Sequence, residues 1–219
     1  ELEAFVQMIS HDLRAPLTSI DGFAWLAREA AEGKFGPLEM EYLDRILRAS
    51  ENMEKMINAM LDMARIGFQS PKRMEVDLRK TVEDIWEELR VSALRPGARL
   101  EFSLQVERVA CIPVLLRQVL VNLMENALKF NTRSETPLVE VGSRRQDEET
   151  LVFVRDDGPG IPAGFEESIF EPFQRLESAS PGSGIGLSAV RRIVFSWGGE
   201  IWVESEPGAG STFYFTIPD

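Results

Sequence analysis

Two stretches of apolar residues at spacings of three and four constrain the fold of the first third of this 219-residue chain. The first covers residues 1–31 and ends before the breakers Gly33 and Gly36-Pro37; the second covers residues 38–67. The periodic positions of the second are Leu43, Ile46, Leu47, Ser50, Met53, Ile57, Met60, Leu61 and Ala64. This periodicity predicts two amphipathic helices joined by a short loop, which is an antiparallel helical hairpin.

The predicted hairpin has wide apolar faces that two helices cannot bury alone. A second copy would complete a four-helix bundle, so we expect a homodimer through residues 1–69. The alternative is that both helices pack against the remainder of the chain.

Beyond a short linker at Ser70–Arg73 the pattern changes to alternating strands and helices. We expect strands at Met74–Leu78 (an edge strand), Arg99–Val106, Leu138–Arg145, Glu149–Asp157, Glu200–Glu204 and Thr212–Ile217, and helices at Lys80–Leu94, Pro113–Lys129 and Ile185–Trp197. The strands at 138–145 and 149–157 flank a polar turn and should pair. Residues 70–219 are therefore predicted to form an α+β domain in which helices cover one face of a mixed sheet.

Composition limits the functions that this chain can have. Its net charge of −12 argues against a broad nucleic-acid-binding face, although a nucleotide needs only a few local donors and a metal ion. The one cysteine, Cys111, lies in an apolar run, which predicts a buried thiol in a reducing compartment. No apolar stretch approaches the ~20 residues that span a bilayer, and no signal peptide is visible. We expect a cytoplasmic protein, and the start without Met predicts a piece of a longer one.

The chain has a single histidine, His11, within MISHDLRAPLTSI at residues 8–20. Asp12 follows it, and a neighbouring carboxylate can hold the Nδ1–H and leave Nε2 free to attack. On its own, a lone histidine on an amphipathic helix is more often a surface or core residue. The carboxylate of the adjacent Asp12 favours the interpretation that His11 is a nucleophile.

A second candidate site lies on the predicted helix at residues 115–131. Asn122 and Asn126 are four residues apart and Lys129 lies one turn further along, so all three share a face. Amide oxygens could bind Mg²⁺ and the lysine a phosphate. A solvated polar stripe is the ordinary alternative.

Two glycine-containing segments follow. In VRDDGPGI, residues 154–161, Asp156 ends a strand, and its carboxylate could accept a hydrogen bond from the amine of adenine. Gly158 and Gly160 allow the turn after it. In PGSGIGL, residues 181–187, a glycine-rich loop enters a helix N-terminus, a favourable place for phosphates. It lacks the strand and βαβ unit of a dinucleotide fingerprint.

The order of these motifs, with the FEPF segment at residues 170–173 between the last two, resembles that of the sensor histidine kinases over residues 5–217. The resemblance implies a dimerisation and phosphoacceptor domain at 1–69 and an α/β-sandwich ATP-binding domain of the Bergerat type at 70–219. It implies that ATP phosphorylates His11 and that the phosphoryl group passes to an aspartate of a response regulator. The sensor domain would lie upstream, outside this sequence.

The resemblance also assigns roles to individual residues. It implies that His11, Asp12 and Asn122 are catalytic and that Asn126 and Asn122 bind Mg²⁺. The ATP-binding residues that it implies are Asn122, Asn126, Lys129, Asp156, Gly158, Gly160, Arg175, Gly182, Gly184, Gly186 and Leu187, with residues 173–182 as a lid.

One position favours phosphoryl transfer over ATP hydrolysis. The related gyrase-type ATPases carry a glutamate where this chain has Asn122, and an amide cannot activate water as a base. Many histidine kinases carry Thr or Asn where this chain has Ala15, which predicts weak phosphatase activity towards the partner. Phe130 stands where many histidine kinases carry a tyrosine, and it keeps the packing surface of that residue.

The remaining alternatives for the function of the chain are a nucleotide-binding dimeric scaffold, a gyrase- or chaperone-type ATPase and a serine-directed kinase.

Overall fold

The computed structural model describes residues 17–20, 22–28, 36, 40, 42–43, 46–47, 50, 72–91, 97–131, 133–171, 174 and 186–219. The chain divides into two compact units, Glu1–Ser70 and Pro71–Asp219, which we call the hairpin unit and the sheet unit.

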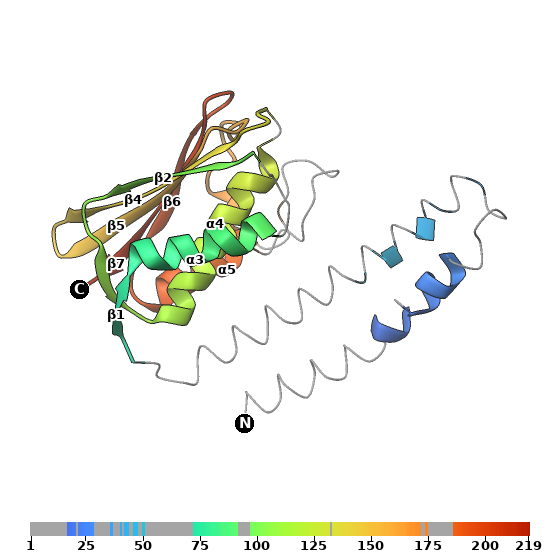
Figure 1. Cartoon of the computed structure of the whole chain (residues 1–219), viewed down its shortest axis with the longest axis horizontal. Coiled ribbons are helices and arrows are strands. Elements are labelled where there is room, and N and C mark those ends of the chain that lie inside the picture. Colours follow the sequence, from blue (N-terminus) through green and yellow to red (C-terminus); the bar gives the residue numbers. More distant parts are fainter. Residues whose placement is uncertain are drawn as a thin grey trace. The chain divides into compact units, whose positions relative to one another are not determined.

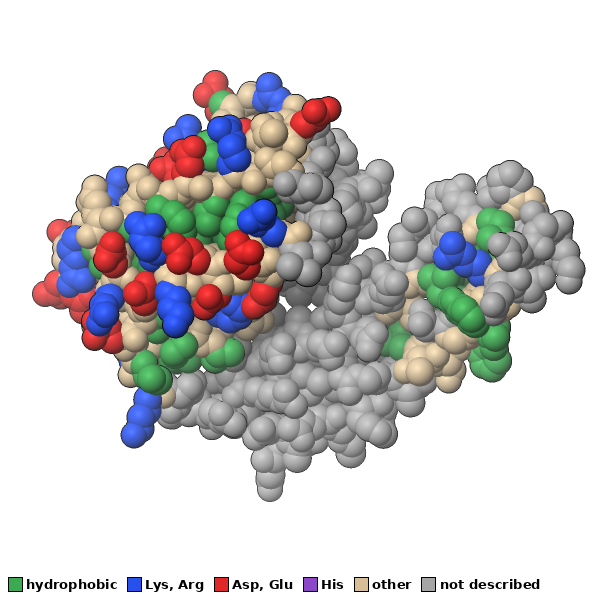
Figure 2. Space-filling view, in the orientation of Figure 1, with side chains coloured by type: hydrophobic (Ala, Val, Ile, Leu, Met, Phe, Trp, Pro, Cys, Tyr) green, Lys and Arg blue, Asp and Glu red, His purple; other side chains and the backbone are tan. Residues whose placement is uncertain are grey.

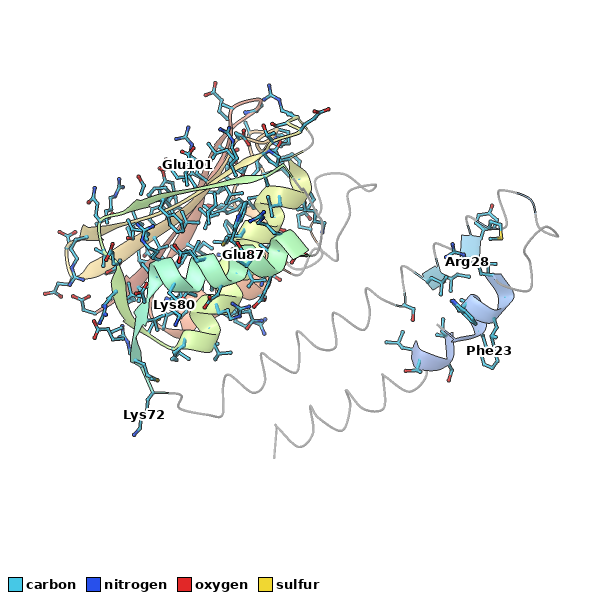
Figure 3. All side chains as sticks on the ribbon, in the orientation of Figure 1. Phe23, Arg28, Lys72, Lys80, Glu87 and Glu101 are labelled. Atoms are coloured by element: carbon cyan, nitrogen blue, oxygen red, sulfur yellow. The ribbon has the colours of Figure 1, made fainter. Side chains whose placement is uncertain are left out.

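The described residues of the hairpin unit are helical on both sides of Gly36, at 17–20 and 22–28 and at 40, 42–43, 46–47 and 50. The Ser50 Oγ–H donates to the Leu17 carbonyl at 3.3 Å, and both residues are buried, so the two helical segments lie side by side. Phe23, in contrast, is 73% exposed (Figure 3). The predicted hairpin is confirmed where the structure describes it.

The sheet unit contains a five-stranded mixed sheet in the order β2-β4-β5-β7-β6 (Figure 1). Its strands are β2 (Arg99–Leu104), β4 (Leu138–Gln146), β5 (Glu149–Asp156), β6 (Ile201–Glu206) and β7 (Gly210–Pro218). Only β2 and β4 pair in parallel, and the other neighbours are antiparallel. The mixed sheet and the strand pair at residues 138–157 are as predicted.

Helices α3 (Leu78–Val91), α4 (Pro113–Phe130) and α5 (Gly186–Ser196) cover one face of this sheet (Figure 1). Helix α4 buries eight apolar side chains, so it is the centre of the core. Asp77 caps α3 by accepting a hydrogen bond from the Lys80 N–H at 2.9 Å. Lys80 and Glu87 are exposed on the outer side of α3 (Figure 3), where charges of both signs are interspersed (Figure 2).

The first strand lies outside the five-stranded sheet. β1 (Met74–Asp77) pairs antiparallel with β3 (Arg108–Cys111) in a separate two-stranded sheet. The β3 strand was not predicted, because its apolar residues run without a break into the apolar start of α4. Cys111 ends this strand as a buried free thiol, and burial raises its pKa to about 11, which suits the predicted structural role.

The face of the sheet opposite the helices carries a row of aromatic rings. Trp202 stacks on Tyr214 with centroids 5.3 Å apart, and Phe153 follows at 6.1 Å. The Phe153 ring fills the space over Gly142 on the next strand. A groove of about 560 Å³ lies along this face. Its lining also includes Asp156, Ser205 and Gly210, which belong to the site described below.

Candidate functional site

Helix α4 carries the polar residues at the centre of the candidate site. Pro113 starts it at the first helical position, where a missing N–H costs nothing. Its apolar residues face the sheet and the other helices, while Asn122, Asn126 and Lys129 are half-buried. The side chain of Asn126 has no hydrogen-bond partner among the described residues. The Lys129 Nζ lies 5.1 Å from the centroid of the exposed Phe130 ring.

Asn122 links α4 to the start of α5. Its Nδ2–H donates to the Gln118 carbonyl at 2.8 Å, which turns its oxygen towards α5. A Cβ added to Gly186, the first residue of α5, would lie 2.8 Å from that oxygen. Only glycine lets the two elements approach this closely without a shift. The Asn122 amide oxygen and the N-terminus of α5 are thus adjacent. The oxygen could coordinate a cation, and the helix N-terminus could bind the anion paired with that cation.

Asp156 lies at the end of β5 on the face covered by the helices, in register with Val139 and Ser211. The Gly158 N–H donates to its Oδ1 at 2.8 Å, and the Ser211 N–H is a second backbone donor. A Cβ at Gly158 would lie 2.7 Å from the same oxygen, so this glycine makes room for the carboxylate.

Burial raises the pKa of Asp156 to about 6, partly offset by the two backbone N–H donors and reinforced by the negative charge of Asp157. A half-buried carboxylate is a strong acceptor for a ligand N–H, because little water competes with the ligand for its oxygens. This carboxylate is therefore a candidate for recognising an amine such as that of adenine.

The hairpin of β6 and β7 holds the Asp156 turn in place, a role that the local sequence pattern does not predict. Gly160 has φ +75°, and a Cβ there would lie 2.2 Å from the Glu206 carbonyl oxygen. The Ser205 Oγ accepts from the Ile161 N–H at 2.8 Å and donates to the Gly210 carbonyl at 2.9 Å. The sequence Pro207-Gly208-Ala209-Gly210 between the last two strands indicates a turn, but a turn motif does not reveal its tertiary partner.

The structure thus brings together the residues predicted on α4, in the Asp156 turn and at the start of α5. Asn131 at the end of α4 contacts Asp157, and Leu187 lies half-buried in the first turn of α5. His11, Asp12, Arg175, Gly182 and Gly184 lie outside the described residues.

Two further observations concern the part of the chain that the structure describes. It contains no cluster of three or more His, Cys, Asp or Glu side chains suited to a metal ion, so a metal there would depend on other donors such as amides. None of its helices has the length and apolar character needed to cross a membrane.

Two family models match this chain. The His Kinase A (phospho-acceptor) domain matches residues 1–69, and the histidine kinase-, DNA gyrase B- and HSP90-like ATPase matches residues 111–219. The elements β1, α3 and β2, and all of β3 except Cys111, precede the second match but belong to the same compact unit.

Among curated proteins, the methanogenesis regulatory histidine kinase FilI of Methanothrix harundinacea (strain 6Ac) is 34% identical over 218 residues, covering 100% of this chain and 25% of FilI. The chain spans 25% to 30% of the length of the first curated relatives that it matches.

Among solved structures, full-length ShkA in complex with AMPPNP aligns with a TM-score of 0.71 at 25% identity, covering 98% of this chain and 45% of that one. Histidine kinase ThkA in complex with the response regulator TrrA has a TM-score of 0.66 at 23% identity, covering 98% and 61%. The second likeness concerns the fold alone.

Proposed function

Because this chain belongs to the sensor histidine kinase family, we propose that it is the ATP-dependent kinase core of a two-component signalling system. Residues 1–69 are then the dimerisation and phosphoacceptor domain, and residues 70–219 the ATP-binding domain. The two compact units and the ranges of the two family matches support this division.

In this proposal ATP lies against α4 and the two segments that contact it. Asp156 accepts a hydrogen bond from the adenine amine, and Gly158 and Gly160 shape its turn. The phosphates lie towards the N-terminus of α5, at Gly186 and Leu187, with Lys129 as a nearby cation. Gly182, Gly184 and Arg175 belong to the same site by the family pattern. The raised pKa of Asp156 and the Asn122–Gly186 approach support this placement.

Asn126 and Asn122 are the proposed Mg²⁺ ligands. The hydrogen bond from the Asn122 Nδ2–H to Gln118 leaves its oxygen as the atom facing α5, and a hard cation prefers an oxygen ligand. When bound, Mg²⁺ would offset charge on the transferring phosphoryl oxygens.

His11 is the proposed nucleophile. Its Nε2 attacks the γ-phosphorus in line, the new N–P bond forms, and the bond to the ADP oxygen breaks. Asp12 holds the Nδ1–H and stabilises the positive charge that develops on the ring. One observation carries this assignment: the only histidine of the chain lies within the residues that match the phospho-acceptor family.

We propose that an aspartate of a response-regulator receiver domain is the final acceptor. The solved complex of ThkA with its response regulator supports a partner of this class. The reaction belongs in the cytoplasm, where ATP is available. The greater length of the relatives leaves room for an upstream sensor domain in the whole protein.

Weak phosphatase activity is part of the same proposal. Ala15 has no polar group that could position water against a phosphorylated partner. We expect the phosphorylated response regulator to decay at nearly its own rate when this chain is added with ADP. Strong acceleration of that decay would contradict the expectation, and Ala15→Thr provides the comparison.

The decisive experiment is incubation with γ-labelled ATP and Mg²⁺, with His11→Gln as the matched variant. We expect label that is acid-labile, alkali-stable and absent from the variant. Nucleotide binding without label would favour a scaffold, and label that persists in His11→Gln would show that another residue is the acceptor.

A further inference from the structure

Asn131, which follows α4, is a buried polar residue to which neither the motifs nor the proposed chemistry assigns a role. Its side chain is 1% exposed, and a buried amide is costly unless it is hydrogen-bonded. Its Nδ2–H donates to Asp157 Oδ1 at 2.5 Å, across 26 residues of sequence. Its Oδ1 accepts from the Arg133 N–H at 3.3 Å. The amide therefore ties the end of α4 to the end of β5.

The carboxylate of Asp157 extends this connection. Its Oδ1 also accepts from the Leu138 N–H at 2.9 Å, at the start of β4. One amide–carboxylate pair therefore joins three backbone segments: the end of α4, the start of β4 and the turn that follows β5. Hydrogen bonds to an ionised acceptor are stronger than neutral ones, so this pair constrains the three segments firmly.

The turn that carries Asp156 also packs directly on Asn131. A Cβ placed on Gly158 would lie 3.6 Å from the Asn131 Cα, in ordinary van der Waals contact. The chain after Asn131 is anchored as well, since the Arg133 guanidinium donates to the Gly208 carbonyl and the Gly208 N–H donates to Pro159 at 2.7 Å. Asn131 is thus at the centre of the contacts between α4 and the Asp156 turn.

We infer that Asn131 and Asp157 are a positioning pair that sets the distance between the Asp156 carboxylate and the polar face of α4, and with it the affinity for nucleotide. This inference rests on the proposed function, in which the base meets Asp156 and the phosphates meet α4. A nucleotide that must contact both Asp156 and α4 loses affinity when either of them moves by a fraction of an ångström. The pair touches neither base nor phosphate in this proposal, so its effect falls on binding more than on transfer.

The test uses an exchange of the two side chains in the whole chain. Asn131→Asp puts a second carboxylate against Asp157 and should weaken binding of AMPPNP with Mg²⁺ by roughly tenfold or more. Asp157→Asn keeps an acceptor and should have a smaller effect. The double variant Asn131→Asp/Asp157→Asn restores a donor and an acceptor in reversed order, so most of the lost affinity should return.

Ser143→Ala is the matched control for a purely structural role. Ser143 is also 1% exposed and makes two hydrogen bonds to the Val106 backbone, but it lies far along β4 from Leu138. It should lower the melting temperature and leave nucleotide affinity unchanged. In contrast, Asn131→Asp should raise the KM for ATP in His11 labelling by more than it lowers the rate at saturating ATP.

The outcomes separate this inference from the proposed function. If Asp156→Asn binds nucleotide as tightly as the unaltered chain, the proposed nucleotide site is wrong. If Asp156→Asn loses binding while Asn131→Asp behaves like Ser143→Ala, or if the double variant recovers nothing, the positioning role is overturned. If Asn131→Asp does not fold, Asp157→Asn and the double variant still decide the matter through their affinities.

Discussion

Asp156 shows at the residue scale how a binding group can weaken the fold that holds it. Its pKa is raised from 3.8 to about 6, so the folded state binds this proton more tightly than the unfolded state. The free energy of unfolding therefore falls as the pH rises from about 4 to about 6, and the loss is complete above that window. The cost at neutral pH is at most about 3 kcal/mol.

We predict that Asp156→Asn stabilises the nucleotide-free chain at pH 7 and removes this pH dependence, because an amide oxygen can still accept from Gly158 without a buried charge. The same variant should lose nucleotide affinity. In the unaltered chain, affinity should fall by about tenfold per pH unit below pH 6. Thermal unfolding and nucleotide titration between pH 4.5 and pH 8 measure both effects. A destabilised Asp156→Asn variant would contradict the prediction.

Gly160 and Gly164 allow a second comparison at the residue scale. Both have positive φ values, +75° and +88°, but a Cβ at Gly160 meets the Glu206 carbonyl at 2.2 Å, while one at Gly164 meets nothing within 4 Å. We predict that Gly164→Ala costs about 1 kcal/mol from the backbone alone and that Gly160→Ala costs at least about 2 kcal/mol more. Chemical denaturation measures both, and equal losses would show that the β6–β7 contact is not decisive.

At the scale of elements, the approach of α4 to α5 depends on one missing side chain. Gly186→Ala should favour the helix by up to about 1 kcal/mol. However, its Cβ would displace the Asn122 oxygen, which lies 2.8 Å away. We therefore predict a chain that is at least as stable and labels His11 more slowly.

A double-variant cycle isolates the cause of this loss. In the Asn122→Ala background the amide is already absent, so Gly186→Ala should have little further effect on labelling. Additive losses would mean that Gly186→Ala acts through the glycine-rich loop rather than through Asn122.

At the scale of the whole molecule, the hairpin unit exposes several large apolar side chains that a second copy of the chain could cover. Among the residues of this unit that the structure describes, the exposed large apolar ones are Ile20, Phe23, Trp25, Leu26, Tyr42 and Ile46. Burying such a side chain contributes about 1.5–3 kcal/mol, so a second copy that covers several of them gives a stable dimer. This supports the expected homodimer through residues 1–69.

We predict that the chain sediments as a dimer and that Phe23→Glu shifts it to monomer, since an unpaired charge in an apolar interface is costly. Thr18→Glu, at another exposed helical position of the same unit, adds the same charge as a control. Equal dissociation of both variants, or none with Phe23→Glu, would argue against a bundle built on this surface.

The local pattern of the sequence was sufficient for most elements and for the candidate residues. The spacing of apolar residues by three and four predicted α4, because this spacing places them on one face of a helix. Alternation predicted β2 and the pair of β4 and β5. Asn122, Asn126 and Asp156 could be proposed from residue chemistry and motif order. The β3 strand was missed, because four residues next to an apolar helix start carry no distinct period.

Only the tertiary structure decided which distant segments meet at the site. The contacts of Asn131 with Asp157, and of Gly160 with Glu206, join residues 26 and 46 positions apart. Likewise, the raised pKa of Asp156 results chiefly from its burial in the folded chain. Sequence by itself determined which elements form and which side chains can do chemistry, since these are local properties. Distances, burial and register depend on how the whole chain packs, which no local pattern contains.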